Sequence, residues 1–434
     1  MNDAHSWDAI DAALAKRRCF AADLFARLAE GSSDGQGITR ASYGDGEAFA
    51  HELMAQTAQN QGLGVESDAA CNTYMILPGG GAPRIVIGSH LDSVQNGGNF
   101  DGAAGVVAGL TALAALKDAG FEPPGDLCVM AIRAEESAWF GVSYIGSRAA
   151  LGLLPDGALD NARRTDTQRS LADHIADAGG DPAALRAGAR HFDPATLGAY
   201  LELHIEQGPV LDTKGIAVGV VTGIRGNFRY PDARITGEYS HCGGVPRDYR
   251  RDAVVAAADF IHALDLLWSQ IEAKGGDMAF TIGKLFTDTD QHAMTKISGC
   301  VRFSLDVRTL DPDFLAELEI IVKRHAARIA ETRGVTFDLG QITRAAVGKI
   351  DPGIEDALAD GAGQLAIPVL RMASGAAHDA AAFAAAGVPT AMIFVRNAHG
   401  SHNPHEAMEI DDFMQATRLM TWWLTQKSGA FLDL

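Results

Sequence analysis

Cysteine is scarce in this sequence, and the five that occur are scattered along it. No two of them form a C-x-x-C pair and their number is odd, so a disulfide framework is not expected and a reducing compartment fits. We interpret all five as small buried apolar residues. They are Cys19, Cys71, Cys128, Cys242 and Cys300.

Positive charge is in short supply, and membrane and export signals are missing. The chain has 36 lysines and arginines against 55 aspartates and glutamates, a net charge of −19, which would repel nucleic acid. No uninterrupted apolar run reaches the length of a membrane span, and the start MNDAHSWDAIDAALAKRRCF has no basic region followed by an apolar one. We therefore predict a cytoplasmic protein with no membrane and no nucleic acid among its partners.

Apolar material is ample. Hydrophobic residues make up 47% of the 434 residues and charged residues 21%, the usual balance of a globular protein. At about 100–200 residues per domain, this length predicts two or three domains.

The first part of the chain alternates strand-like and helix-like segments. Residues 84–88 and 126–133 read as buried strands, and the Ala/Leu-rich segment 102–119 between them reads as a helix. Strand, helix and strand within about 50 residues predict a βαβ unit and a parallel sheet. Near the end, residues 389–395 predict another strand and 411–426 a closing helix.

The middle of the chain follows a different pattern. Polar and apolar residues alternate over 219–237, and an Ala-rich amphipathic helix is expected at 252–267. Residues 279–285 and 299–307 look like paired strands, and 311–332 predicts a second helix. This βαββαβ-like order suits a compact α+β domain, inserted between two strands of the first domain.

Two polar segments with metal-ligand residue types follow the first predicted strand. In the segment 88–93, His90 and Asp92 face the same way on extended backbone. Asp92 can accept a hydrogen bond from one ring nitrogen of His90 and leave the other for a metal, although a surface turn is the alternative. The Gly-rich loop 96–102 delivers Asp101 to a helix start, where it can cap the helix or bridge two ions.

Three further polar segments lie at predicted strand ends or in loops. Glu135 and Glu136 point to opposite sides of extended backbone, so one can bind a metal while the other approaches water. The segment 201–208 places His204 on one face with two glutamates, and 400–406 is a polar loop. Each segment alone fits a turn or strand edge. Together they supply nitrogen and oxygen ligands without thiolates, which suits zinc, with manganese or cobalt as alternatives.

These five segments, in this order, resemble the M20 family of metallopeptidases and amidases. Within it they resemble the hydantoinase/carbamoylase branch of N-carbamoyl-L-amino-acid hydrolases, β-ureidopropionases and allantoate amidohydrolases. The resemblance covers most of the chain and is carried by GSHLDSVQNGGNFDGAAGV, LELHIEQGPVL and MIFVRNAHGSHNPHE. The histidine in LELHIEQG marks the amidase branch, because many peptidases of the family have a carboxylate there.

The resemblance implies an α/β fold in two domains. A catalytic domain with a mixed sheet and a two-metal site would span residues 1–221 and 337–434. A smaller α+β, ferredoxin-like domain at 222–336 would interrupt it and serve as dimerisation and lid domain. The expected assembly is a homodimer through this inserted domain.

The resemblance also implies five ligands for two divalent metal ions per subunit, zinc by preference. One ion would lie between His90, Asp101 and His204. The other would lie between Asp101, Glu136 and His402, so that Asp101 bridges the two.

Catalysis would then depend on three more side chains. Asp92 would orient His90, and Glu135 would be the general base that takes a proton from water and hands it to the leaving nitrogen. His241 matches a histidine that helps polarise the carbonyl, commonly across the dimer, although a turn residue is the alternative. The implied reaction is hydrolysis of a C–N bond in a small N-carbamoyl or ureido acid, of N-carbamoyl-amino acid or allantoate type.

Substrate contacts are implied by the same resemblance. Arg308 matches an arginine that grips the substrate carboxylate, although a surface salt bridge is equally compatible with its place at a strand end. The other implied contacts are Thr295, Asn227, Gln207, Ser374, Gly375 and His378.

Three departures from the branch pattern concern the substrate. The chain has NFR at 227–229 for Gln-Arg-Trp, HCGGVPR at 241–247 for HAGTTPM, and Thr295 for an amide-bearing residue. All proposed metal ligands are kept, so the chemistry is indicated more firmly than the substrate. An N-acyl-amino-acid hydrolase or dipeptidase of the same family is the alternative. A catalytically silent binding protein would have lost ligands or the base, and both Glu135 and Glu136 are present.

Overall fold

The computed structural model describes residues 7–427 and divides the chain into two compact units. Unit 1 runs up to Thr222 and resumes at Lys349, and unit 2 is Gly223–Gly348. The sequence-based range for the inserted domain ends at 336 rather than 348. The added residues belong to unit 2 because β14 (Thr343–Ala345) pairs with β7 (Gly226–Thr236). Residues 1–6 and 428–434 of the expected catalytic range lie outside the described residues.

Unit 1 is built on an eight-stranded sheet in the order β1-β2-β4-β3-β5-β16-β6-β15. Parallel pairs join β3 to β4, β3 to β5 and β5 to β16, whereas β1–β2, β2–β4 and β16–β6 are antiparallel. The mixed sheet expected for the fold class is therefore confirmed. Its strands are β1 (Gly64–Ser67), β2 (Thr73–Leu77), β3 (Ala82–His90), β4 (Gly125–Ile132), β5 (Leu197–Ile205), β6 (Val218–Ile224), β15 (Val369–Ser374) and β16 (Thr390–Val395).

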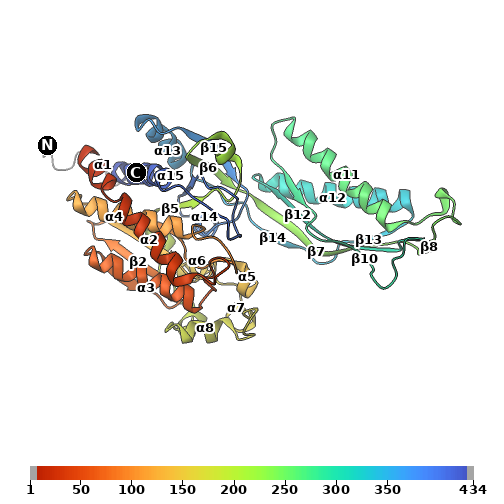
Figure 1. Cartoon of the computed structure of the whole chain (residues 1–434), viewed down its shortest axis with the longest axis horizontal. Coiled ribbons are helices and arrows are strands. Elements are labelled where there is room, and N and C mark those ends of the chain that lie inside the picture. Colours follow the sequence, from red (N-terminus) through yellow and green to blue (C-terminus); the bar gives the residue numbers. More distant parts are fainter. Residues whose placement is uncertain (1–6, 428–434) are drawn as a thin grey trace. The chain divides into compact units, whose positions relative to one another are not determined.

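The predicted βαβ unit is present as β3, α4 (Ala103–Asp118) and β4. α4 is made of small and aliphatic residues and is buried on nearly every side. The sheet covers one side, and α1 (Trp7–Ala15), α2 (Arg18–Ser32) and α15 (Ile410–Lys427) pack on α4 as well (Figure 1). Each fully buried Leu or Val contributes about 1.5–3 kcal/mol, so α4 anchors the loop that leads into it.

β5 is buried along its whole length. Leu201 and Leu203 belong to the core that contains α4, while Tyr200 stacks on Phe383 of α14 (Ala380–Ala385) with ring centroids 3.8 Å apart. The predicted alternation holds, but the polar face is covered by protein. A strand edge facing water is therefore wrong for this segment.

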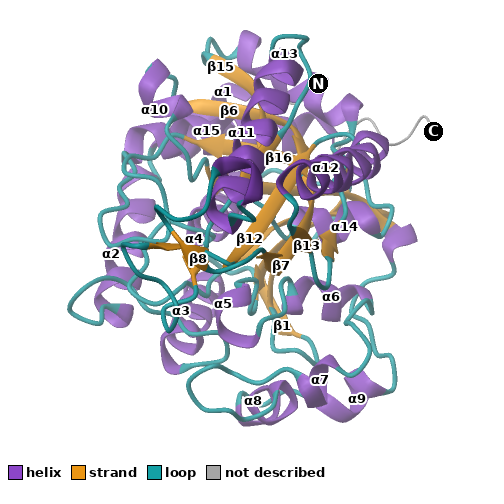
Figure 2. Ribbon diagram, turned by 90° about the vertical axis from the view of Figure 1, so that its right-hand side faces the viewer, coloured by secondary structure: helices purple, strands orange, loops and turns teal. Residues whose placement is uncertain are grey.

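The remaining helices of unit 1 complete its surface. In Figure 2, α7, α8 and α9 lie side by side at one end of the unit. The helices not named so far are α3 (Asp45–Asn60), α5 (Ser137–Phe140), α6 (Ile145–Leu151), α7 (Ala158–Asn161), α8 (Leu171–Asp177), α9 (Pro182–Arg186), α10 (Val210–Lys214) and α13 (Pro352–Gln364).

Unit 2 has its own sheet in the order β10-β12-β7-β13, with β9 added to β12 and β14 to β7. The helices α11 (Ala253–Glu272) and α12 (Pro312–Arg333) share one core with the sheet, in which Phe260 packs on Phe303 and Phe337. The strands of unit 2 whose bounds have not yet been given are β8 (Ser240–His241), β9 (Ala279–Thr281), β10 (Leu285–Thr287), β11 (Lys296–Ile297), β12 (Cys300–Thr309) and β13 (Thr336–Asp338).

One expected strand in the middle of the chain differs in the structure, and one helix there has the composition of a membrane span. The strand expected at 279–285 is split, because β12 shifts register between Phe303 and Leu305 and the Ser304 hydroxyl accepts the Lys284 N–H there. Within residues 7–427, α11 alone has the length and composition of a membrane span. Its buried face nonetheless packs into the core of unit 2.

The interpretation of the cysteines is right for two of the five. Cys128 and Cys300 are buried, Cys71 and Cys242 are partly exposed, and Cys19 is exposed. Cys19 lies outside the apolar stripe of α2, which is formed by residues such as Leu24, Phe25 and Leu28.

Candidate metal centre

His90 is the last residue of β3, and its ring is held by the residue two positions on. The Nδ1 atom lies 3.0 Å from the peptide oxygen of Asp92 and 3.3 Å from its carboxylate Oδ1. An imidazole that donates its Nδ1–H to these oxygens directs its Nε2 lone pair away from them. Asp92 thus has the geometry to orient His90, with the peptide carbonyl as the nearer partner.

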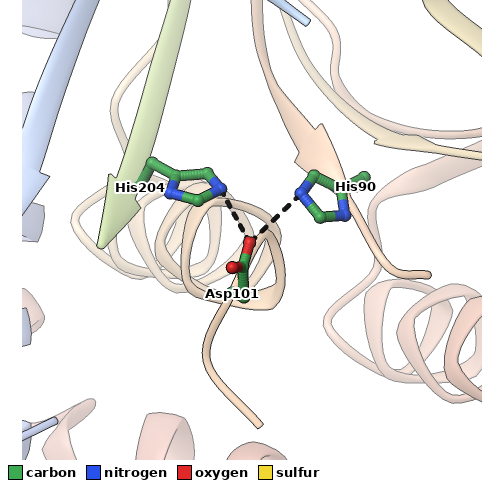
Figure 3. Close-up of side chains that lie close together, drawn as sticks. All are labelled: His90, Asp101 and His204. Carbon is green, nitrogen blue, oxygen red and sulfur yellow. Dashed lines mark ion pairs between the residues drawn. The ribbon is translucent and has the colours of Figure 1, made fainter. Parts of the chain in front are cut away.

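Asp101 does not cap α4, which is the simpler role that its position suggested. Gly102 takes the N-cap position, and the Asp101 carboxylate turns back between His90 and His204 (Figure 3). Its Oδ1 lies 3.5 Å from the Nε2 of His90 and 3.2 Å from the Nε2 of His204. All three side chains are buried, and this Oδ1 has no hydrogen-bond partner within residues 7–427.

His204 presents the same nitrogen as His90. Its Nδ1 faces the Ile205 carbonyl at 2.9 Å, and its Nε2 accepts the N–H of Gly102 at 3.2 Å. The Nε2 atoms of two imidazoles and one carboxylate oxygen therefore converge in a buried place, and the carboxylate oxygen has no donor. The chemistry of this set fits a divalent ion.

Charge coupling within this group is strong. Burial disfavours the imidazolium of His90, but the nearby carboxylates of Asp101 and Asp92 raise its pKa well above the ordinary value. Burial likewise opposes ionisation of Asp101, but His204 and His90 hold its pKa well below the ordinary value. The carboxylate is therefore kept in the charged form that binds metals.

A second group lies around the other oxygen of Asp101. The Nε2 of His402 is 3.1 Å from Glu136 Oε1 and 3.5 Å from Asp101 Oδ2. The side chain of His402 is 49% exposed, and its hydrogen bond with Glu136 raises its pKa to about 9. Gln207 Nε2 also donates to Asp101 Oδ2 at 2.7 Å, and the Ser401 hydroxyl lies within hydrogen-bond distance of the same oxygen. Asp101 thus faces both groups, one with each oxygen.

Glu135 is buried next to the first group, with its Oε2 4.0 Å from the Nε2 of His90. Burial raises the pKa of its carboxyl well above the ordinary value, and the charges of Glu136 and Asp379 add to the effect while His90 opposes it. A carboxyl group in this environment holds a proton more readily than an exposed one, which suits a group that accepts and then releases a proton.

The segment 374–379 contacts His204 through the ring of His378. The ring of His378 is 4.5 Å from that of His204, and its Nε2 is 2.9 Å from the Ser374 hydroxyl. Ser374 and His378 are buried, whereas Gly375 between them is exposed. Burial and the charge of His204 hold the pKa of His378 well below its ordinary value. The role of all three as substrate contacts stays a prediction.

Gln207, another predicted contact, lies in unit 1 beside Asp101, and its role as a substrate contact stays a prediction. The three other predicted contacts and the predicted catalytic residue His241 lie in unit 2, in two pairs. Asn227 and Arg308 are opposite each other in the β7–β12 ladder, and Arg308 contacts Asp306 through two nitrogens at 2.9 and 3.1 Å. His241 and Thr295 lie beside each other at the β8–β11 pair.

The exposed ring of His241 has a local partner. It accepts the N–H groups of Gly243 and Gly244 at 3.2 and 2.9 Å, as a turn residue does. Whether His241, Asn227, Thr295 and Arg308 contact substrate stays a prediction.

Sequence reasoning missed several residues that hold the loops of this centre. Glu406 accepts the N–H groups of Phe100 and Asp101 at 2.8 and 3.2 Å and the Ser401 hydroxyl at 2.7 Å. Its place at the end of GSHNPHE was a usable signal. Ser42, which donates to Asp92 Oδ2 at 2.6 Å, is far from every motif, and nothing in the sequence marked it.

Comparisons with known proteins match most of the chain. Residues 86–426 match the description "Peptidase family M20/M25/M40". The chain is 35% identical to the N-carbamoyl-L-amino acid amidohydrolase of Geobacillus stearothermophilus, over 93% of this chain and 98% of that one. It is 29% identical to the allantoate amidohydrolase of Escherichia coli, over 91% and 94%. A hydantoinase/carbamoylase family amidase from Burkholderia ambifaria has a similar structure, with a TM-score of 0.82, 29% identity and 97% and 98% of the chains covered.

Proposed function

This chain belongs to peptidase family M20/M25/M40, and we propose that it is a metal-dependent amidohydrolase that cleaves a C–N bond in a small N-carbamoyl or ureido acid. The two curated relatives named above support the reaction class, since one is an N-carbamoyl-L-amino acid amidohydrolase and the other an allantoate amidohydrolase. The observation that carries the proposal is the buried Oδ1 of Asp101, which lacks a donor and faces the Nε2 atoms of two histidines.

We propose two ions, zinc by preference, at the two groups that share Asp101. In each group the candidate ligand atoms lie within 4.8 Å of one another. Nitrogen and oxygen donors without thiolates suit zinc, manganese or cobalt. A divalent ion bound here supplies Lewis acidity, which lowers the pKa of water and polarises the substrate carbonyl.

Glu135 is the proposed general base. Its carboxylate takes a proton from the attacking water, and the protonated group then delivers that proton to the leaving nitrogen as the C–N bond breaks. Because burial raises the pKa of Glu135, the carboxyl can hold the proton between these two steps. With a carbamoyl-amino acid and one water, the products are the free amino acid, ammonia and carbon dioxide.

The substrate is a small molecule with a carboxylate. Arg308 is the proposed partner of that carboxylate, and His241 the proposed donor to the carbonyl oxygen. A homodimer through unit 2 and a cytoplasmic location belong to the same proposal.

The test is a turnover screen of the full-length protein, stripped with a chelator and reloaded with zinc, manganese or cobalt. We expect ammonia release from N-carbamoyl-amino acids or allantoate. Release of amine from N-acyl-amino acids or dipeptides alone would favour the related hydrolase activity instead. Retained metal with no turnover of any of these substrates would identify a binding protein.

A further inference from the structure

The backbone that carries Glu135 and Glu136 is held by side chains from other parts of unit 1. Four consecutive peptide N–H groups follow the end of β4, and each donates to a side-chain oxygen. These bonds run from Arg133 to Asn72 (2.9 Å), from Ala134 to Glu47 (2.8 Å), and from Glu135 and Glu136 to the two oxygens of Asp92 (3.0 and 3.1 Å). The acceptors Asn72, Glu47 and Asp92 are fully buried.

Ala134 adopts a conformation that alanine rarely takes. Its φ is +54°, in the left-handed region, and its side chain is fully buried. This turn directs the chain from β4 so that the next two N–H groups meet Asp92. A non-glycine residue keeps such a conformation when the bonds around it hold it there.

Glu47 provides the bond to Ala134 itself. It lies in the first turn of α3, and its Oε1 accepts the Ala134 N–H. Its Oε2 accepts the Tyr43 N–H at 2.6 Å and the Arg133 Nη1 at 2.9 Å. Its hydrogen-bond partners Tyr43, Arg133 and Ala134 are all donors, so the N–H₂ group of a glutamine at position 47 would face one of these N–H groups without an acceptor.

We propose that Glu47 is a positioning residue of the reaction: it holds Ala134 in the left-handed turn and so fixes the directions of Glu135 and Glu136. This role rests on the proposed function, in which one of these glutamates moves a proton and the other binds a metal. Glu47 precedes residues 86–426, the part of the chain that the family description matches.

The test compares Glu47→Gln with a matched control. Asp126 is a carboxylate at the other end of β4 and also accepts one peptide N–H and one arginine, from Gly79 at 3.0 Å and Arg84 at 2.9 Å. For Glu47→Gln we expect kcat to fall about tenfold to a hundredfold, with KM close to wild type. Asp126→Asn should keep the wild-type kcat.

A second substitution separates positioning from general stability. Glycine adopts positive φ without strain, so Ala134→Gly added to Glu47→Gln should restore part of the lost kcat. A purely structural role of Glu47 does not predict this rescue. Should Glu47→Gln fail to fold, Arg133→Lys takes its place, because it weakens the contact of Arg133 with the Glu47 carboxylate. The same rescue by Ala134→Gly is expected.

Hydrogen exchange gives a readout that needs neither metal nor turnover. In metal-free protein, the amides of residues 134–136 should exchange faster in Glu47→Gln than in wild type or Asp126→Asn. Unchanged exchange together with unchanged kcat would overturn the proposal, as would a loss of kcat that Ala134→Gly leaves in place. A wild-type protein inactive on every substrate would contradict the proposed function, and exchange would still decide whether Glu47 holds the turn.

Discussion

At the scale of single residues, neighbouring glutamates have different surroundings. Glu135 is next to His90 in a buried position, whereas Glu136 contacts His402, whose side chain is half exposed. The pair leaves β4 on a backbone fixed by Asp92, so their side chains have distinct partners although they adjoin in sequence. This separation suits the proposed roles, in which Glu135 moves a proton and Glu136 binds a metal.

The proposed roles predict different losses for the two glutamates. Glu135→Gln keeps the shape of the side chain but cannot accept a proton, so we expect kcat to fall by about 10²–10⁴ with the metal content unchanged. Glu136→Gln should instead lower the number of metal ions bound per chain. Turnover and elemental analysis of both variants provide the measurement. Wild-type turnover in Glu135→Gln would eliminate Glu135 as the base.

At the scale of elements, the start of α4 is fitted to the imidazole of His90. Gly102 has a φ of +66°, and a Cβ added to it would lie 2.5 Å from atoms of the His90 ring. Because this backbone also donates to His204, the helix start contacts both histidines of the first group. The glycine is thus required by space as well as by conformation.

A pair of substitutions at the two ends of α4 separates these requirements. Gly102→Ala should lower metal affinity and kcat, because the new methyl group displaces the His90 ring in addition to straining the backbone, which has a φ of +66° and a ψ of −50° there. Gly120→Ala is the control: its φ is +69°, but nothing lies within 4 Å of the added Cβ. Metal titration of both variants measures the effect, and equal losses would mean that strain alone is responsible.

The elements that sequence predicted are those with a strong local pattern. The βαβ unit of β3, α4 and β4 is confirmed because two apolar runs and an Ala/Leu-rich segment mark it. Short strands such as β1 and β13 have no period long enough to be seen. The ligand residues were found through motifs, whereas Ser42 and Glu47 act only once the chain has folded, through partners 50 and 87 residues away.

At the scale of the whole molecule, the two units have separate cores. The core of unit 1 surrounds α4, and that of unit 2 surrounds residues such as Phe260. All five proposed metal ligands belong to unit 1, since they lie before Thr222 or after Lys349. Metal binding is therefore linked to the folding of one unit.

Removal of the metal should accordingly destabilise unit 1 selectively. A ligand at a hundred times its Kd stabilises the state that binds it by about 2.7 kcal/mol, and a chelator withdraws that contribution. We expect faster hydrogen exchange in β3 and β5 after chelation, with α11 and α12 of unit 2 unchanged. Equal acceleration in both units would contradict this linkage, and no change in either would argue against a bound metal.

The strand order of unit 1 has a consequence for synthesis on the ribosome. β6 neighbours β16 and β15, both of which follow unit 2 in the chain, and β5 gains its second neighbour only with β16. At about 5–20 residues per second, translation from β6 to β16 takes on the order of ten to thirty seconds. During that time one edge of β5 and both edges of β6 have no partner in the nascent protein, which favours chaperone binding over unassisted folding. A chain released before His402 would also carry only four of its five proposed ligands.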